Sequence, residues 1–399
     1  MMKYKKIQQA SFLLLIILMV GLGLQSFLGA FPLGILSYPA NVILVLLLLF
    51  LSILICRLLP EHKITRFLAS GTAALSSLLF IGILSIILGL TLQTNDTHIT
   101  DIPARLGIRE MTSYYPFILS YLYLVITLSF ATFRRLKWEV SSINICFFLN
   151  HAGLLIVLFS LGFGTADKLQ LRARVQEGGV IHKALAQSGK EYDLPFRLKL
   201  IDFQMETYLP KLAIIDDKTG KFLPEGSPEF YDVDSTEHTF SLQHQSYRML
   251  TYLDNAAPDK NGSYMYKKDD SLPPAVLIRL ASGNQGWITC GNQQVPYKML
   301  VLPNNQAMVM MSPEAKAYSS LVQIKQDGVE SEHLIEVNKP LHLGPWSVYQ
   351  SSFDDKQGKA STISIFQFIY DPWKILTQIG LTMLVLGALS LFWKHQQKH

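Results

Sequence analysis

The sequence is poor in charge and in cysteine. Only 16% of its 399 residues are Asp, Glu, Lys or Arg, against about a quarter in ordinary soluble domains. The three cysteines, Cys56, Cys146 and Cys290, form no C-x-x-C and no C-x-x-C-H motif. A thioredoxin-like dithiol enzyme and a c-type cytochrome are therefore excluded. G-x-S-x-G and H-E-x-x-H are also absent, so nothing indicates a serine hydrolase or a zinc protease.

The chain has long apolar runs instead. Its mean hydropathy is +0.25. A membrane core of about 30 Å is crossed by about 20 apolar residues, and we expect six such spans: Ser11–Phe31, Ala40–Leu59, Phe67–Leu92, Tyr114–Phe133, Ile143–Gly164 and Trp373–Trp393. The chain is therefore predicted to be an integral membrane protein in contact with lipid. This excludes a cytosolic enzyme, a nucleic-acid-binding domain and a disordered scaffold.

The distribution of charge predicts the topology. Residues 165–372 hold 21 Lys+Arg and 25 Asp+Glu out of totals of 35 and 30, so the basic excess lies in the loops and tails around the spans. With the N-terminus inside, the short outside loops hold only Arg105 and Arg109. Eleven basic residues then lie inside: Lys3, Lys5, Lys6, Arg57, Lys63, Arg66, Arg134, Arg135, Lys137, Lys394 and Lys398. By the positive-inside rule, both termini are cytoplasmic and residues 165–372 are extracytoplasmic.

Short alternating apolar segments are predicted in the extracytoplasmic region. They run through Phe196–Phe203, Lys211–Ile215, Ala275–Leu280, Gly286–Thr289, Tyr297–Leu302, Ala307–Met311, Leu321–Gln326, Trp346–Ser351 and Ser361–Tyr370. Turn residues separate them at intervals typical of an antiparallel sandwich or open barrel. The expected organisation is two N-terminal spans (1–66), three further spans (67–164), a β-rich extracytoplasmic domain (165–372), and a last span with a cytoplasmic tail (373–399).

His151 is the one His, Asp, Glu, Lys or Arg residue in the interior of the six expected spans. An ionisable side chain in a span is costly to bury and is a candidate functional residue. It would lie roughly 12 Å from the cytoplasmic edge at about 1.5 Å per residue. Neutral imidazole can ligate haem iron or relay protons. The alternative is a structural histidine bonded to a neighbouring helix.

The remaining histidines and glycines give weaker signals. Gly21 and Gly23 fit close helix packing better than phosphate binding. A metal site at His238 and His244 is not supported, because no Cys or carboxylate lies at ligand spacing. Surface or strand positions are expected for His182, His333 and His342.

Two stretches resemble the ResB/CcsB family of cytochrome c biogenesis, the system II pathway. The first is Phe148-Leu-Asn-His-Ala-Gly-Leu-Leu-Ile156, which continues through Leu161–Lys168 to Arg174-Val-Gln-Glu-Gly178. The second is Val337–Asp354, with Asn338-Lys-Pro-Leu341 and Tyr349-Gln-Ser-Ser-Phe-Asp354, followed by Tyr370-Asp-Pro-Trp373. These motifs occur in the family's order and cover about residues 67–393. The first two spans lie outside the resemblance, and their role stays open.

The resemblance implies one half of a haem exporter and synthetase. His151 corresponds in position to the family's intramembrane axial ligand of haem b. A CcsA-type partner would carry the tryptophan-rich haem-binding loop, because the five Trp residues here include no adjacent pair. Together the two would present haem to apocytochrome c in the bacterial cytoplasmic membrane. The thioether chemistry would belong to the partner, so this chain is expected to be a non-catalytic subunit.

Two other functions remain open. One is a membrane scaffold or assembly factor for envelope proteins that binds no haem. The other is a small-molecule transporter, although inverted repeats and interrupted spans are not evident.

The topology can be tested with a reporter. A reporter that is active only in the cytoplasm, fused after Gly262, should be silent, because the basic residues favour the opposite side for this region. Strong activity at that position would overturn the predicted topology.

Overall fold

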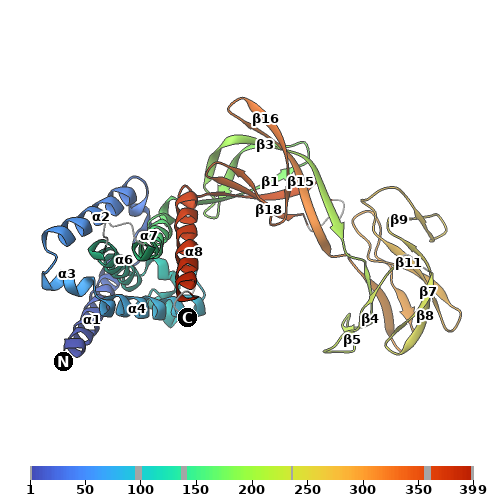
Figure 1. Ribbon diagram of the computed structural model, residues 1–399. Helices are drawn as coiled ribbons and strands as arrows, with labels where there is room; N and C mark the ends of the chain where they lie inside the picture. The colour runs from blue at the N-terminus through green and yellow to red at the C-terminus, as the bar shows by residue number, and fades with distance from the viewer. Residues whose placement is uncertain (1, 95–100, 136–141, 235–236, 355–360, 397–399) are drawn as a thin grey trace. The chain divides into compact units, whose positions relative to one another are not determined.

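The structure is a computed structural model that describes residues 2–94, 101–135, 142–234, 237–354 and 361–396. The side chains of residues 2–6, 142–143 and 391–396 lie outside this description. The chain forms two compact units. The first is helical and combines Met1–Lys168 with Asp371–His399, and the second is built of strands from Leu169 to Tyr370 (Figure 1).

The helical unit contains eight α-helices and three 3₁₀ turns in the described residues. The α-helices are α1 (Met2–Leu28), α2 (Ala40–Leu58), α3 (Lys63–Leu68), α4 (Gly71–Leu90), α5 (Ile102–Arg105), α6 (Tyr115–Arg135), α7 (Ser142–Gly162) and α8 (Lys374–Gln396). The 3₁₀ turns are η1 (Leu33–Leu36), η2 (Ile108–Ser113) and η3 (Thr165–Asp167). All of the helices predicted before the β-rich region, including the two N-terminal ones, belong to this single unit.

Five helices in the described part of the chain are long and apolar enough to cross a membrane. They lie at Ile7–Leu28, Ala40–Leu58, Gly71–Leu90, Ile102–Arg135 and Asn144–Gly162. The expected count of six is wrong. The last expected span forms α8, whose described apolar part is Lys374–Ser390. The backbone of α8 is helical for 23 residues, and the count of five applies to the described residues alone. The side chain of Trp393 and the whole of Trp138, both expected at the inner interface, lie outside the described residues.

The expected span from Phe67 to Leu92 is divided near its start. Helix α3 ends at Leu68, and α4 begins at Gly71 after Ser70, whose hydroxyl accepts a hydrogen bond from the Ala73 amide. Serine is a strong N-cap residue because it satisfies an otherwise unpaired amide of the first turn. The sequence pattern missed this break because the residues on both sides of it are apolar.

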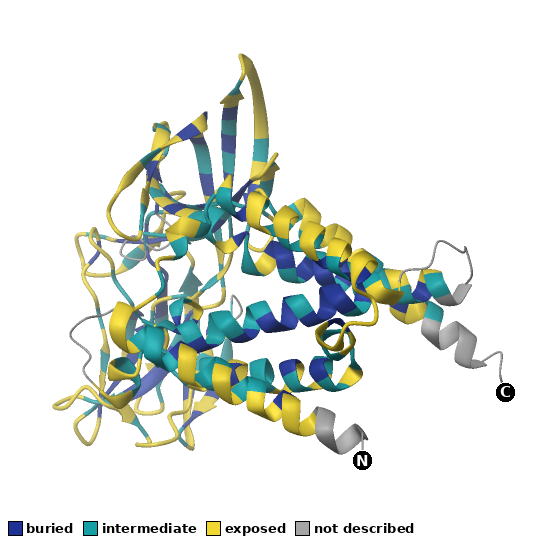
Figure 2. Cartoon of the chain, turned by 90° about the vertical axis from the view of Figure 1, so that its left-hand side faces the viewer, coloured by how far each residue is buried: buried dark blue, intermediate teal, exposed yellow. Residues whose placement is uncertain are grey.

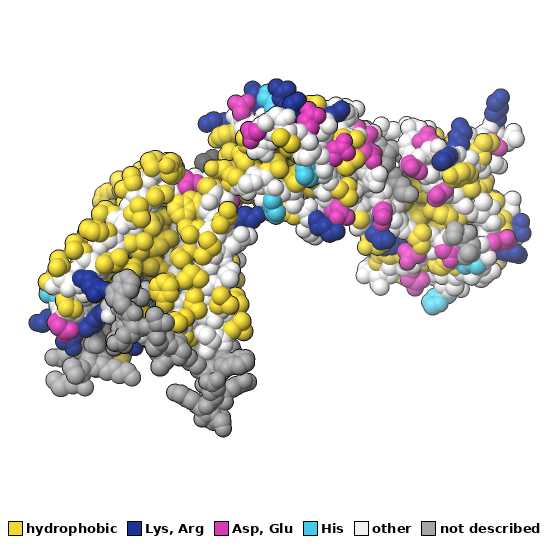
Figure 3. All heavy atoms as spheres, turned by 45° about the horizontal axis from the view of Figure 1, so that its top comes forward, with side chains coloured by type: hydrophobic (Ala, Val, Ile, Leu, Met, Phe, Trp, Pro, Cys, Tyr) yellow, Lys and Arg dark blue, Asp and Glu magenta, His cyan; other side chains and the backbone are white. Residues whose placement is uncertain are grey.

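Helix α6 is the most enclosed of the long helices. It packs against α1, α2, α4 and α7, and Figure 2 shows buried residues gathered inside the helical unit. Its buried hydroxyl groups, on Ser120, Thr127, Ser129 and Thr132, donate to backbone carbonyls three or four residues earlier. This satisfies them without water, as a hydrocarbon environment requires. Hydrophobic side chains cover most of the visible surface of the unit in Figure 3.

Small residues bring pairs of helices close together. A Cβ atom added to Gly21 of α1 would lie 2.7 Å from Pro116 of α6. One added to Gly153 of α7 would lie 2.9 Å from the Gly380 carbonyl of α8, and Gly380 faces Gly153 in the same way. Glycines at these positions allow the helix backbones to approach, which is a common basis of packing within membranes. The structure therefore explains Gly21 by packing, as expected. The same expectation is wrong for Gly23, where an added Cβ atom would have no described atom within 4 Å.

The second unit contains an antiparallel sheet of eight strands that nearly closes into a barrel. In sheet order the strands are β16 (Val329–Glu336), β15 (Ala315–Gln326), β3 (Glu191–Thr207), β2 (Val180–Ala186), β1 (Leu169–Gln176), β19 (Ile363–Tyr370), β18 (Trp346–Phe353) and β17 (Leu341–Leu343). A β-bridge joins Glu336, the last residue of the edge strand β16, to Lys339, which lies just before the other edge strand, β17. Leu198, Leu200, Phe366 and Phe368 are among the buried core residues. The predicted β-rich, barrel-like fold is thus confirmed.

The other strands of this unit enclose a second core. One sheet has the order β12 (Gln285–Thr289), β11 (Ala275–Leu280), β8 (Gln245–Leu253) and β7 (His238–Leu242). Another has β13 (Leu300–Leu302), β14 (Gln306–Met311), β4 (Lys211–Asp216) and β5 (Phe222–Leu223), with β6 (Tyr231–Asp232) also paired to β4. The short hairpin β9 (Ala256–Pro258) and β10 (Tyr264–Tyr266) is separate. Met249, Ile278 and Met308 are buried in this core.

A polar triangle is buried inside the eight-stranded sheet. The Gln350 side-chain oxygen lies 2.6 Å from the Ser320 hydroxyl and 2.8 Å from that of Ser364, and the two hydroxyls are 2.9 Å apart. The Gln350 amide donates to the Ser352 carbonyl across a strand irregularity. Because buried polar groups are costly when unpaired, this arrangement gives the glutamine of Tyr349-Gln-Ser-Ser352 a structural role.

We expect Gln350→Leu to destabilise the β-rich unit by about 1–3 kcal/mol, because a buried polar network loses its central member. Thermal or urea unfolding of the full-length protein in detergent would measure the change. Gln170→Leu, at an exposed position of β1, is the matched control and should be nearly neutral. Equal stabilities of the two variants would show that the network contributes nothing.

Candidate functional site

His151 lies in α7, nine residues after the helix begins at Ser142. At 1.5 Å per residue it is about 13 Å from that end. The side chain is half-buried. The structure therefore places this histidine well inside an apolar helix, as predicted.

One ring nitrogen of His151 is held by its own helix. Nδ1 lies 3.1 Å from the carbonyl oxygen of Phe147, one turn earlier. A carbonyl can only accept a hydrogen bond, so this contact requires the proton on Nδ1 and leaves the lone pair on Nε2. Within the described residues, no hydrogen-bond partner is recorded for Nε2. Metal-bound histidines are commonly oriented in this way through the other nitrogen.

The Phe147 ring also fixes the plane of the imidazole. The two ring centroids are 3.9 Å apart and the planes differ by 28°, which is a stacked arrangement. Residues four apart lie on the same face of a helix, so Phe147, His151 and Leu155 share one face. Leu155 packs into a cluster with Val125 and Leu128 of α6. His151 therefore lies on the side of α7 that packs toward α6.

The neighbouring residue, Asn150, has a structural environment. Its amide donates to the Cys146 carbonyl at 2.9 Å. A Cβ atom added to Gly387 of α8 would lie 2.6 Å from the Asn150 side chain. The Cys146 thiol lies 3.6 Å from the Gly387 carbonyl. Asn150 thus packs against α8.

Asp167 joins three parts of the helical unit. Its carboxylate accepts hydrogen bonds from the Trp373 indole, the Asn41 amide and the Tyr38 backbone N–H, each at 2.7 Å. Beside it, Lys168 forms an ion pair with Asp371 at 3.0 Å. Burial raises the pKa of Asp167, but the hydrogen bonds from Trp373, Asn41 and Tyr38 prevail and lower it. The two motifs of the resemblance, around Asp167 and Asp371-Pro-Trp373, therefore meet here.

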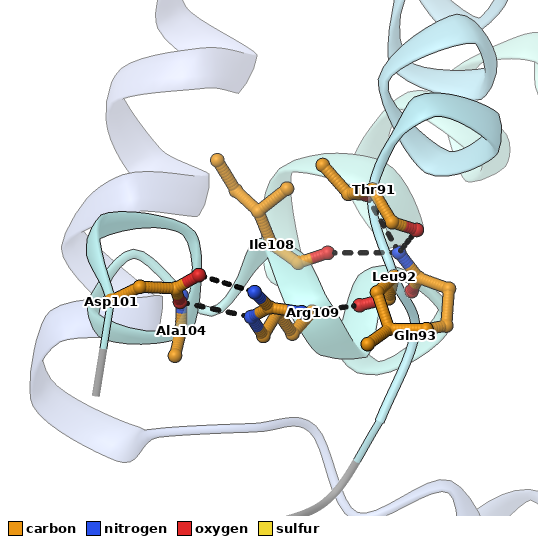
Figure 4. A network of polar contacts seen from close by, with 7 residues as sticks. All are labelled: Thr91, Leu92, Gln93, Asp101, Ala104, Ile108 and Arg109. Atoms are coloured by element: carbon orange, nitrogen blue, oxygen red, sulfur yellow. Dashed lines mark hydrogen bonds and ion pairs between the residues drawn. The ribbon is translucent and has the colours of Figure 1, made fainter. Parts of the chain in front are cut away.

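A second polar network holds the loop between α4 and α6 (Figure 4). Arg109 makes a two-point contact with Asp101, including Nε to Oδ1 at 2.9 Å, and donates to the Leu92 carbonyl at 3.1 Å. The hydrogen bond from Arg109 holds the pKa of Asp101 at about 2. Gln93 binds the Met111 amide and the Ile108 carbonyl. Every polar group at the centre of this network has a partner, so we assign it a structural role.

The family motifs of the β-rich unit also converge. Arg174 and Asp354 form an ion pair at 2.7 Å, and the Glu177 carboxylate accepts a hydrogen bond from the Phe203 amide at 2.8 Å. These contacts join β1 to the ends of β18 and to β3. They fix strand ends and present no free reactive group.

The histidines of the β-rich unit lie on separate strands and turns. His238 contacts the Tyr231 hydroxyl and lies 3.2 Å from Asp234 through its other nitrogen. His244 lies in a turn with positive φ, while His182, His333 and His342 are on strands, as expected. In the described ranges no three His, Cys, Asp or Glu side chains are grouped so as to hold a metal ion.

A comparison with protein families shows what one part of the chain resembles. Residues 302–368 match the model of the ResB-like family. The predicted resemblance is confirmed. The matched segment runs from the end of β13 into β19 and so lies within the β-rich unit. A search of curated proteins gave no match. The match spans 67 of the 399 residues, and the ResB-like family is linked to cytochrome c biogenesis by system II and to haem handling.

Asp167→Asn should destabilise the helical unit by about 1.5–3 kcal/mol, because the charge-assisted hydrogen bonds of the carboxylate are weakened. The control is Asp217→Asn, which removes the same charge from an exposed turn of the β-rich unit. Since the pKa of Asp167 is lowered in the folded state, its contribution is present above the unfolded pKa and is lost as the pH falls through the folded value.

Unfolding in detergent at neutral and at acidic pH would measure this difference. The difference in the free energy of unfolding between wild type and Asp167→Asn should become smaller at acidic pH. A gap that stays constant, or a variant as stable as wild type, would contradict the role of the carboxylate.

Proposed function

We propose that this chain is the CcsB/ResB-type subunit of a cytochrome c haem-attachment complex. It would help move haem across the membrane and present it to apocytochrome c together with a CcsA-type partner. The observation that carries the proposal is His151, an imidazole inside an apolar helix. Its Nδ1 is held by the Phe147 carbonyl, and its Nε2 has no hydrogen-bond partner among the described residues. The ResB-like match supports the pathway independently.

In this proposal haem is the cargo, and His151 supplies one axial ligand through Nε2. Haem iron takes imidazole readily, and the vinyl groups of haem are what react with the cysteine thiols of an apocytochrome. The Phe147 carbonyl keeps the proton on Nδ1, and the Phe147 ring holds the imidazole plane. Within the described residues, the apolar parts of the long helices hold no second histidine; His395 lies beyond the apolar part of α8, which ends at Ser390. The other axial ligand would therefore come from the partner.

The remaining features of the proposal concern the assembly. Both termini would be cytoplasmic, and the β-rich unit would face the other side of a bacterial cytoplasmic membrane, where it would dock the partner and the apocytochrome. The positive-inside bias supports this orientation. We assign no catalytic residue, so the chain would be a non-catalytic subunit of the haem lyase.

One observation favours a second function. The family match lies entirely within the β-rich unit and does not include His151. A scaffold that docks envelope proteins through this unit, with His151 as a structural residue bonded to its own helix, would have the same features. The two functions differ in whether the purified protein binds haem through a histidine.

His151→Ala should leave the protein assembled but with little haem, because the axial bond is lost. Cytochrome c maturation should fall with it, and added imidazole should partly restore both by taking the vacated coordination position. The absorption spectrum of the purified complex would measure haem content. His151→Tyr and His151→Cys should retain some haem with altered spectra, since both side chains can ligate iron.

His182→Ala, at an exposed position of β2, is the matched control and should have no effect on haem. Membrane abundance of each variant separates loss of haem from loss of fold. Full haem content and full maturation in His151→Ala would reject the ligand role and leave the scaffold function.

A further inference from the structure

Three side chains form a stack at the end of the helical unit where α6 finishes and α7 begins. The Arg135 guanidinium carbon lies over the Phe147 ring, 5.4 Å from its centroid. Phe147 in turn stacks on His151 at 3.9 Å. We call this the Arg135–Phe147–His151 stack. It brings the last residue of α6 next to the candidate haem ligand of α7.

Several arginines near the helix ends have a carboxylate neighbour, whereas Arg135, like Arg57 at the end of α2, has none among the described residues. Arg134 lies 3.7 Å from Glu61, Arg66 lies 3.6 Å from the same carboxylate, and Arg109 is paired with Asp101. Arg135 has no ion pair and no hydrogen bond with any described residue. Its exposed guanidinium therefore has five N–H donors available to an anion.

The position of Arg135 relative to His151 limits what the anion could be. The separations of 5.4 Å and 3.9 Å place the guanidinium carbon at most about 9 Å from the His151 ring centroid. A ligand whose centre is bound by Nε2 would meet Arg135 only if it carried an anionic group near its rim. Haem has this form, since its two propionate carboxylates extend from one edge of the macrocycle.

We propose that Arg135 binds a propionate carboxylate of the haem held by His151, and so selects haem with free carboxylates. This inference rests on the proposed function. Arginine suits the task because its planar guanidinium can bind a carboxylate through two parallel hydrogen bonds while it lies over an aromatic ring. The Phe147 ring makes two contacts in this arrangement. It stacks on the His151 imidazole, and the Arg135 guanidinium lies over it in a cation–π contact.

Haem titrations of the purified full-length protein in nanodiscs of neutral lipid would test the proposal. The two probes are ferric protoporphyrin IX haem and its dimethyl ester, in which both carboxylates are uncharged. Wild type should bind the free acid about tenfold more tightly than the ester, as one charge-assisted hydrogen-bonded pair predicts. Arg135→Gln should lose this preference but keep the histidine-ligated spectrum. Arg135→Lys should retain part of the preference, because it keeps the charge without the planar fork.

Arg134→Gln is the matched control, because it removes an adjacent cation that already has a carboxylate neighbour. It should preserve the preference for the free acid. A preference that persists in Arg135→Gln, or that disappears equally in Arg134→Gln, would overturn the assignment. If the preference persists in Arg135→Gln, a lipid phosphate becomes the expected ligand of Arg135. Phosphatidylglycerol in the nanodisc should then change the thermal stability of wild type but not of Arg135→Gln.

The failure of this inference is distinct from failure of the proposed function. If wild type gives a histidine-ligated spectrum and binds both haems equally well, only the role of Arg135 is wrong. If wild type gives no such spectrum with either haem, and His151→Ala behaves identically, the proposed function itself is wrong.

Discussion

The carboxylate of Asp167 is the contact on which the helical unit depends most. The chain leaves this unit after Lys168 and returns at Asp371, after about 200 residues of strands. Closing a loop of that length costs about 5 kcal/mol in chain entropy. Asp167 offsets part of this cost by binding Trp373 at the return, while Asn41 and Tyr38 tie α2 to the same carboxylate. The ion pair of Lys168 with Asp371 joins the points where the chain leaves and re-enters the helical unit.

The first and last strands of the β-rich unit are also paired. Leu169 of β1 lies opposite Tyr370 of β19, so the two ends of that unit are adjacent as well.

The absence of water inside a membrane constrains the polar groups of the helices. Asn41 is fully buried, and its amide is satisfied by Phe163 and Asp167. The hydroxyls of α6 bond to their own helix. Among the described residues, His151 satisfies only one of its two nitrogens in the same way. The residual Nε2 is the feature that packing does not explain, and for this reason it carries the functional argument.

Much of the architecture could be predicted from the sequence, because its signals are local. The strand Ala275–Leu280 was predicted with its observed bounds, since it is a short apolar run between Pro274 and the turn residues Ser282 and Gly283. Strand β16 was missed, because most of its residues are exposed and its sequence, Val-Glu-Ser-Glu-His-Leu-Ile-Glu, has little apolar alternation. His151 was found because an ionisable residue stands out in an apolar run. The contact of Asp167 with Trp373 was not found, although both motifs were noted, because it joins residues 206 positions apart. The Arg135–Phe147–His151 stack likewise depends on how two helix ends meet, which no local pattern specifies.

The limited size of the site fits the proposed handling of haem as cargo. A protein that stores haem permanently surrounds it with apolar side chains and supplies strong axial coordination. Here the described residues supply the imidazole of His151 on a half-buried helix face and the guanidinium of Arg135 at the end of α6. A single axial bond and a single ion pair leave most of the macrocycle to be covered by something else. Under the proposed function, that arrangement would suit a subunit that releases haem, because the affinity of the complete site would then depend on the partner. On this argument the separation of the two subunits would weaken haem binding more than any single substitution outside His151, since it removes the second ligand and most of the apolar cover together.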